Sequence, residues 1–246
     1  MSGKVFAATL LLLWLAGVQP AMAESPKVQP PPNAELGIEK LGNEKFRIGN
    51  VIVDKAARRF SLPARVAHTT DPLEYFAVAR GGAKEYESLL ELDATATQFQ
   101  LASILIGLDD ARSVKPRYQF DERPAEGPAV DIHIDWSDEF RSVSITASEA
   151  LMFDRKPITS DEWVYTGSVT EANGQFMAET IGSVISFVHD PFAIIDHHSG
   201  IGVGKYGSIT GNGVLLPPVG ATVTVSVSLN QQDKRGEASK PIEPRE

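Results

Sequence analysis

Three of the five histidines of this chain lie in one short stretch that is also rich in aspartate. The stretch contains His189-Asp190 and then Asp196-His197-His198. Imidazole and carboxylate groups are the usual ligands of zinc and other divalent ions where no thiolate is present. However, adjacent side chains in a strand point to opposite faces, and Pro191 favours a loop here. We therefore favour loop histidines without a metal, and metal ligation is the alternative.

A second constellation, Asp131-Ile132-His133-Ile134-Asp135, puts three potential ligands on one face of a strand, because side chains two residues apart point the same way. A polar face is also what a strand shows to water. A zinc site would need a further ligand from another element, and the sequence indicates none. The structural interpretation is the simpler one.

Two carboxylates, Glu85 and Glu87, follow Gly81-Gly82 in the segment Lys84-Glu85-Tyr86-Glu87-Ser88. At a loop edge such a pair could serve acid–base chemistry or bind a cation, although charged turns between strands are common. The candidate binding residues of the chain are therefore Glu85, Glu87, His189, Asp190, Asp196, His197 and His198. The sequence assigns no catalytic residue and no metal ligand among them.

The glycine-rich segment 202–207 matches the G-x-G-x-x-G dinucleotide fingerprint in its letters only. That motif needs a preceding parallel strand and a following helix, and Pro217-Pro218 with the intervening glycines cannot supply the helix. No nucleophile elbow, Ser-His-Asp order or metalloprotease helix motif is found. The absence of catalytic signatures favours a non-catalytic protein.

The elements that must position these residues are mostly strands. Apolar residues alternate with polar ones over Val130–Trp136, over Ser142–Ala147 and over Thr222–Leu229, which predicts half-buried strands with one wet face. Further strands are predicted at Phe46–Val53, Arg59–Val66, Leu73–Val78, Leu89–Leu92, Trp163–Thr166 and Val184–Val188.

One segment is typical of a helix. Asp93 or Thr95 can cap it, and Leu101, Ile104, Leu105 and Leu108 follow the i, i+3, i+4, i+7 spacing of an apolar stripe. We expect that stripe to lie on a sheet. The predicted fold class is α+β, mainly β, with antiparallel sheets and one principal helix packed on a sheet.

The two ends of the chain differ from its middle. Lys4, the apolar run Val5–Val18 and Ala21-Met22-Ala23 predict a signal peptide over residues 1–23, with export to the periplasm or outside the cell. We expect cleavage to leave no stable membrane anchor. Residues 24–44 read as a proline-rich flexible linker, residues 45–229 as one domain and residues 230–246 as a disordered polar tail.

Composition excludes several functions. Without residues 1–23, 22 basic side chains face 32 acidic ones, and no basic cluster occurs, so nucleic acid is not an expected partner. The chain has no cysteine, which excludes thiolate-bound zinc, Cys nucleophiles and Cys-ligated iron–sulfur clusters. We expect no cofactor, and stability must come from a packed core rather than from disulfides.

Several blocks resemble the YdjY-domain family of secreted bacterial proteins. They are Leu73-Glu74-Tyr75-Phe76, Gly82–Leu89, Leu105–Leu108, Val130–Trp136, Trp163–Ser168, Ser183–Phe192 and Leu216–Gly220. The resemblance spans residues 45–229. Some relatives carry a ferredoxin-like label, and relatives often have Cys near the positions of Val78 and Ser186 and His at that of Tyr86. Since this chain lacks those Cys residues, it cannot form such a cluster.

Two functional hypotheses follow. The first is an exported, non-catalytic binding or assembly module with an unidentified protein or small-molecule partner. The second is a metal-dependent hydrolase or metal carrier that uses His189, Asp190, Asp196 and His197 or His198. The second requires these side chains to converge within a few ångströms.

Overall fold

The structure is a computed structural model that describes residues 37–138 and 140–230. The predicted signal peptide, residues 24–36 and residues 231–246 lie outside the described residues. The strands are β1 (Ile38–Gly42), β2 (Lys45–Ile48), β3 (Val51–Asp54), β4 (Arg59–Val66), β5 (Tyr75–Val78), β6 (Ser88–Leu92), β7 (Ala129–Ser137), β8 (Ser142–Thr146), β9 (Leu151–Phe153), β10 (Lys156–Pro157), β11 (Trp163–Tyr165), β12 (Ser183–Ser186), β13 (Ile195–His197), β14 (Ile209–Gly211) and β15 (Thr222–Leu229). The helices are α1 (Ala96–Leu105), α2 (Met177–Ile181) and the 3-10 turn η1 (Glu85–Glu87).

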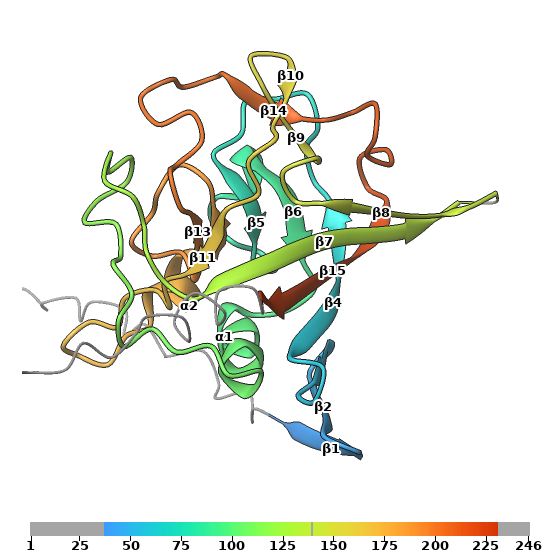
Figure 1. The fold of residues 1–246 in the computed structure, drawn as a ribbon, viewed down its shortest axis with the longest axis vertical. Helices are drawn as coiled ribbons and strands as arrows, with labels where there is room; N and C mark the ends of the chain where they lie inside the picture. Colours follow the sequence, from blue (N-terminus) through green and yellow to red (C-terminus); the bar gives the residue numbers. More distant parts are fainter. Residues whose placement is uncertain (1–36, 139, 231–246) are drawn as a thin grey trace, which may run out of the picture. The chain divides into compact units, whose positions relative to one another are not determined.

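Eight strands form a closed barrel. Their order around it is β4-β15-β7-β11-β13-β12-β5-β6, and β6 pairs back with β4 to close the ring. Strand β4 is shared along its length, since its first half pairs with β3 and its second half with β6. Strands β1, β2 and β3 therefore continue the sheet beyond the barrel, and β8 extends it beside β7 (Figure 1).

The β-rich composition was predicted correctly, but the prediction of simply antiparallel sheets was wrong. Two neighbouring pairs, β5–β6 and β12–β13, are parallel, so the barrel is mixed. Residues 79–87 and 187–194 make these crossovers, and neither contains an α-helix that would signal a parallel pair. Alternating hydrophobicity shows which face of a strand is buried, but not the direction of its neighbours.

The alternation of β7 and β15 does appear as predicted. In β7, Val130, Ile132 and Ile134 are buried while Asp131, His133 and Asp135 are partly exposed. In β15, the three interior valines are buried and the hydroxyl residues between them face outward. A small separate sheet, β10-β9-β14, lies apart from the barrel path.

The helix was predicted in the right place, and most of its predicted stripe packs as expected, since Leu108 is buried and Leu101 and Leu105 are partly buried against the core. Thr95 caps α1, and a capping box with Gln98 fixes its first turn. The buried side is formed by the small or aromatic residues Ala96, Phe99 and Ala102, whereas Ile104 is 52% exposed. Phe99 meets Phe60 of β4 edge to face, with 5.0 Å between ring centroids. Only Ile104 of the predicted stripe faces solvent, and the most deeply buried side of α1 also includes small residues, which allow close packing.

Other boundaries also differ from the predictions. The predicted strand Phe46–Val53 is two strands joined at Gly49-Asn50, and β1 lies inside the range assigned to the linker. Among the described residues, no helix is long and apolar enough to cross a membrane.

Candidate functional site

The sequence analysis predicts a loop for the histidine-rich stretch, but part of the stretch is a strand. Asp196 and His197 belong to β13, a buried strand between β11 and β12. Only His189 and Asp190 lie in the turn before it, where His189 adopts a left-handed φ of +67°. The pattern was too short and too polar to indicate a strand, and its neighbours in the barrel bury it.

His189 is fully buried, and both of its ring nitrogens face backbone carbonyl oxygens. Nδ1 contacts the Asp121 carbonyl, and Nε2 lies 2.9 Å from the His197 carbonyl and 3.2 Å from the His198 carbonyl. His198 is similar, since its Nδ1 lies 2.7 Å from the Ala125 carbonyl. These imidazoles therefore tie the backbone together at this end of the barrel.

His197 points to the opposite side of β13 from Asp196, as adjacent strand residues must. Its ring packs edge to face on Trp163, with 5.3 Å between the centroids. The side chain is 2% exposed, and neither ring nitrogen has a hydrogen-bond partner within the described residues. Burial lowers the pKa of His197 to about 4, so this imidazole is neutral at pH 7.

Two aspartates of the stretch meet directly. The Asp190 amide donates to Asp196 Oδ1 at 3.0 Å, and Thr166 Oγ1 donates to Asp196 Oδ2 at 3.2 Å. Asp190 accepts from the Tyr75 hydroxyl at 2.9 Å and from the Phe192 amide at 2.9 Å. Burial, followed by the charge of Asp190, raises the pKa of Asp196 well above its usual value.

Glu87 joins this group from the other side. It pairs with Lys84 Nζ at 2.7 Å, and its charge acts on Glu74 together with that of Asp190. Burial, then Glu87, raises the pKa of Glu74, whose carboxylate accepts from Gln119 at 2.9 Å. We call Glu74, Tyr75, Glu87, Asp190 and Asp196 the polar cluster. It unites three of the predicted candidates with two residues that the sequence analysis did not select.

Glu85 is separate from the polar cluster. Its carboxylate pairs with Arg65 at 3.1 Å, and Arg65 also binds Glu91 at 2.7 Å. His68 Nε2 lies 3.8 Å from Glu85 Oε2. The two glutamates of the predicted pair thus face different surroundings, one in a surface ion-pair network and one in the interior.

The candidate segments converge, but their donor atoms do not. In residues 37–138 and 140–230, no group of three or more His, Asp or Glu side chains is arranged to hold a metal ion. Both ring nitrogens of His189 contact backbone carbonyl groups. The His197 ring packs on Trp163, on the face of β13 opposite to Asp196.

A long connection between α1 and β7, residues 109–128, lies over the polar cluster. We call it the strap. Gln119 of the strap contacts Glu74, and the Phe120 amide donates to the His189 carbonyl at 3.0 Å. Val114 and Glu126 pair with each other and close the strap into a loop with a narrow neck.

Asp121 holds the strap in shape. Its carboxylate, 1% exposed, accepts from both Arg117 and Arg123 and from their backbone amides. The hydrogen bonds from Arg117, then those from Arg123, hold the pKa of Asp121 well below its usual value. Asp121, Arg117 and Arg123 therefore form an ion-paired group, which we call the clasp, and it fixes the shape of the strap.

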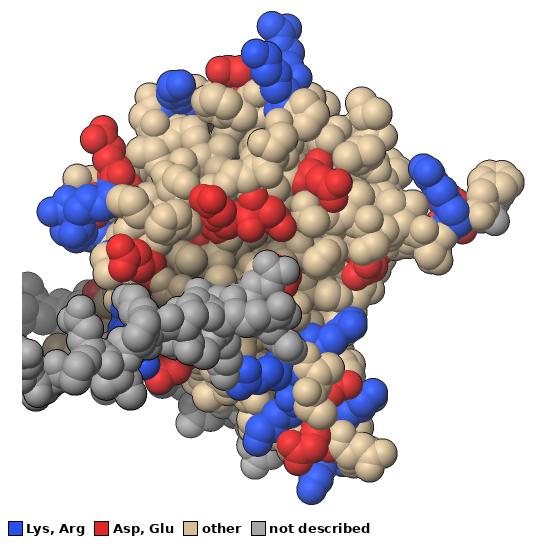
Figure 2. All heavy atoms as spheres, viewed as in Figure 1, with Lys and Arg blue, Asp and Glu red and all other residues tan. Residues whose placement is uncertain are grey.

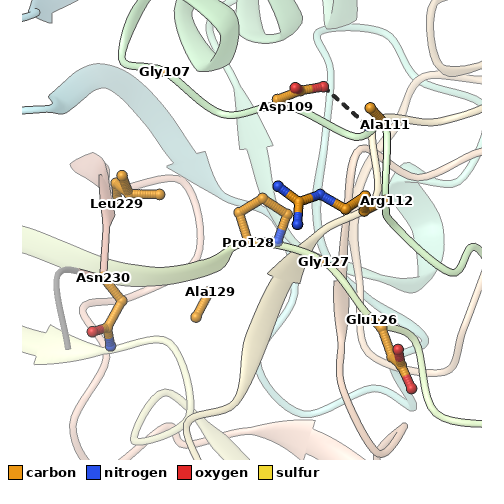
Figure 3. Close-up of a pocket in the computed structure, with 10 residues that line it drawn as sticks. All are labelled: Gly107, Asp109, Ala111, Arg112, Glu126, Gly127, Pro128, Ala129, Leu229 and Asn230. Carbon is orange, nitrogen blue, oxygen red and sulfur yellow. Dashed lines mark hydrogen bonds between the residues drawn. The ribbon is translucent and has the colours of Figure 1, made fainter. Parts of the chain in front are cut away.

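The neck of the strap borders a pocket of about 500 Å³. The pocket is lined by Gly107, Asp109, Ala111, Arg112, Glu126, Gly127, Pro128, Ala129, Leu229 and Asn230. Figure 3 shows the Arg112 guanidinium reaching across the pocket toward Pro128, while the Glu126 side chain points away from it. Arg112 has no carboxylate within 4 Å among the described residues, whereas Asp109 accepts from the Ala111 amide at 2.9 Å.

Two further features belong to this pocket. A Cβ atom at Gly127 would overlap the Tyr165 carbonyl oxygen and lie 2.8 Å from Ser113 Oγ, so only glycine lets the neck approach β11 this closely. Arg58 stands at the rim, because its Nη2 would lie 3.5 Å from a Cβ atom at Gly107. The wall therefore combines the Arg112 guanidinium with the apolar side chains of Leu229 and Pro128.

Comparison with known proteins gives one assignment. The YdjY domain matches residues 51–228, which is most of the chain and all strands from β3 to β14. The chain belongs to the YdjY domain family. This confirms the predicted resemblance. No curated protein and no solved structure gives a significant match to the chain.

Sequence reasoning did not select the pocket of this YdjY domain. Arg112 lies in an ordinary polar stretch, and nothing in its neighbours marks it as a ligand-binding residue. The one usable signal was Gly127-Pro128 directly before the β7 pattern, since such a pair marks a tight approach to a strand. The pocket becomes visible only when the end of β15 is placed beside that pair.

Proposed function

We propose that this YdjY-domain protein is an exported, non-catalytic binding module that holds a small organic anion in the pocket at Arg112. The single observation that carries the proposal is the guanidinium of Arg112, which reaches into a pocket of about 500 Å³ without a carboxylate partner among the described residues. Folding leaves this charge available, and Arg is well suited to bind carboxylate or phosphate in a bidentate way.

The walls of the pocket narrow the class of ligand. Its volume falls in the range of small-molecule sites, which join apolar walls to a few placed polar groups. Pro128 supplies apolar surface beside the Arg112 guanidinium, and Leu229 and Ala129 supply it farther across the pocket. A carboxylate with a short aliphatic chain can pair with the Arg112 guanidinium and pack its chain on the apolar residues.

Export is supported by the signal-peptide pattern of residues 1–23, and the non-catalytic character by the absence of a catalytic motif in the sequence. We do not propose the metal-dependent alternative, because the ring nitrogens of His189 face carbonyl groups and the His197 ring lies on the opposite side of β13 from Asp196.

The test is calorimetric titration of the full chain with three probes, namely acetate, hexanoate and inorganic phosphate. We expect saturable binding of hexanoate, weaker binding of acetate, and at least about tenfold lower hexanoate affinity in Arg112→Gln, because a hydrogen bond to a charged group contributes about 1.5–3 kcal/mol. Arg141→Gln, which changes an exposed arginine beside Asp138, is the matched control. Equal hexanoate affinity in Arg112→Gln and wild type would refute the site.

A further inference from the structure

The outer faces of β15, β7 and β8 form one continuous polar surface outside the pocket at Arg112. Their outward residues are Thr222, Thr224, Ser226 and Ser228 of β15, Asp131, His133, Asp135 and Ser137 of β7, and Ser142, Ser144 and Thr146 of β8. We call this surface the hydroxyl face. Strand pairing places its residues in rows, for example Ser226, His133 and Thr146 side by side.

The hydroxyl face is hollowed in two places. One hollow of about 240 Å³ is lined by Arg59, His133, Asp135, Ser144, Ser226 and Ser228. A second of about 320 Å³ is lined by Asp135, Trp136, Ser137, Ser142, Val143, Ser144 and Thr224. Because the two share Asp135 and Ser144, they make one groove that runs across three strands.

Another part of the same sheet shows what an ordinary wet face looks like here. On β1, β2 and β3 the outward positions carry long charged side chains that pair with each other, Lys45 with Asp54 at 3.4 Å and Arg47 with Glu39 at 3.8 Å. Figure 2 shows charged residues of both signs crowded over this lower region.

Some polar groups of the groove pair with each other, and Ser137 Oγ and Ser142 Oγ lie 3.0 Å apart. Asp135 accepts from Ser226 Oγ at 3.2 Å. Among the described residues, Arg59 has no carboxylate within 4 Å, although its charge acts on Asp54, its neighbour across β3 and β4, and His133 and Ser144 make no side-chain hydrogen bond. Short hydroxyl side chains leave these donors and acceptors open to a ligand.

We propose that the groove of the hydroxyl face binds a neutral polysaccharide chain. One guanidinium and one carboxylate balance within the first hollow, which favours a ligand without net charge. Sugar hydroxyls both donate and accept hydrogen bonds, and the groove offers a pure donor in Arg59, a pure acceptor in Asp135 and groups of both kinds in serine and histidine.

The length of the groove decides between a single sugar and a chain. Neighbouring strands lie about 4.8 Å apart, so a groove across β15, β7 and β8 exceeds one sugar ring. The two hollows are open to the surface rather than enclosed, which suits a section of a longer polymer.

The experiment is calorimetric titration of the full chain with cellohexaose, maltohexaose and chitohexaose. We expect saturable binding of at least one of them, with affinity at least tenfold lower in Asp135→Asn. Ser144→Arg fills the groove from an exposed position and should abolish binding without disturbing the core. Arg47→Gln, on the charged face of β2, should bind as wild type does.

Thermal melting checks that each variant is folded, and Arg112→Gln separates the two proposals, since it should not alter sugar binding. Failure of all three hexasaccharides to bind wild type would overturn the proposal, as would undiminished binding by Ser144→Arg. Binding of polygalacturonate in preference to the neutral sugars would overturn the assignment of a neutral ligand.

Discussion

The polar cluster and the pocket at Arg112 lie at opposite ends of the strap, and they treat polar groups in opposite ways. In the polar cluster, the Tyr75 hydroxyl, Asp190 and Asp196 are each engaged in hydrogen bonds inside the protein. In the pocket, the Arg112 guanidinium has no carboxylate within 4 Å in the part of the chain that the structure describes.

This contrast shows that a dense set of acids and histidines is not by itself a binding site. Burial makes each polar group costly unless it finds a partner, and His189, Asp190 and Asp196 find theirs in the backbone and in neighbouring side chains. A charge at the wall of a pocket is different, because a bound ligand can serve as its partner. The following predictions test the two regions separately.

The largest effect is expected from His197→Leu, which removes a buried imidazole without hydrogen-bond partners beside the polar cluster. An unfolded His takes up a proton near pH 6.5, whereas folded His197 stays neutral down to about pH 4. The unfolded chain therefore binds more protons in this window, and wild-type stability falls as the pH falls. The variant should gain about 3 kcal/mol over wild type between pH 6.5 and 4.

Urea unfolding at intervals across that window measures the effect. His133→Gln is the matched control, because that imidazole lies on the outer face of β7. If His197→Leu showed the same acid sensitivity as wild type, the imidazole would not be the group whose protonation limits stability.

Asp190→Ala should have the next largest effect. It removes the acceptor of both the buried Tyr75 hydroxyl and the Phe192 amide, and an unsatisfied buried donor costs about 1–3 kcal/mol. We expect the free energy of unfolding to fall by about 2 kcal/mol at pH 7, because relief of the repulsion with Asp196 offsets part of the loss. Tyr75→Phe leaves the Phe192 bond intact and should cost less. An unchanged free energy of unfolding in both variants would show that the hydrogen bonds of Asp190 do not contribute to stability.

Asp196→Asn tests the polar cluster through a change of stability with pH that is opposite in direction to that expected for His197. Because burial raises the pKa of Asp196, the folded state holds its proton to higher pH than the unfolded state does. In wild type this carboxyl group therefore makes stability decrease as the pH rises above about 4. The amide variant should lack that decrease, and denaturant unfolding between pH 4 and 8 compares the two slopes. Equal slopes would mean that Asp196 titrates as an exposed residue does.

The sequence revealed much of the fold because its main signal, alternation, follows directly from burial of one face. The range predicted for β4 was Arg59–Val66, and β7 and β15 have the wet faces that were predicted. It did not reveal β13, because Ile195–His197 carries two polar residues whose burial depends on the strands placed on either side. Closure of the barrel depends likewise on the pairing of β4 with β6, which joins distant segments.

The site was harder to predict than the fold for a related reason. The candidates were selected by residue type, and the structure shows Glu87, Asp190 and Asp196 gathered into a satisfied interior cluster. Whether a polar group has a partner is a property of the folded chain. Arg112 differs from Arg117 and Arg123 only in lacking an aspartate, and no pattern in the strap shows which arginines Asp121 will bind.

The smallest effect on stability is expected at the pocket. Arg112→Gln should change the free energy of unfolding by no more than about 0.5 kcal/mol, because the guanidinium makes no ion pair within residues 37–138 and 140–230. The same variant should weaken hexanoate binding, while Glu126→Gln should strengthen it by roughly twofold, because removal of a negative charge from the wall favours an anion. Arg112→Gln should therefore lower hexanoate affinity without lowering the free energy of unfolding. This combination is expected of a residue that binds a ligand and not of one that stabilises the fold. A large loss of stability in Arg112→Gln would place this arginine with the clasp at Asp121 instead.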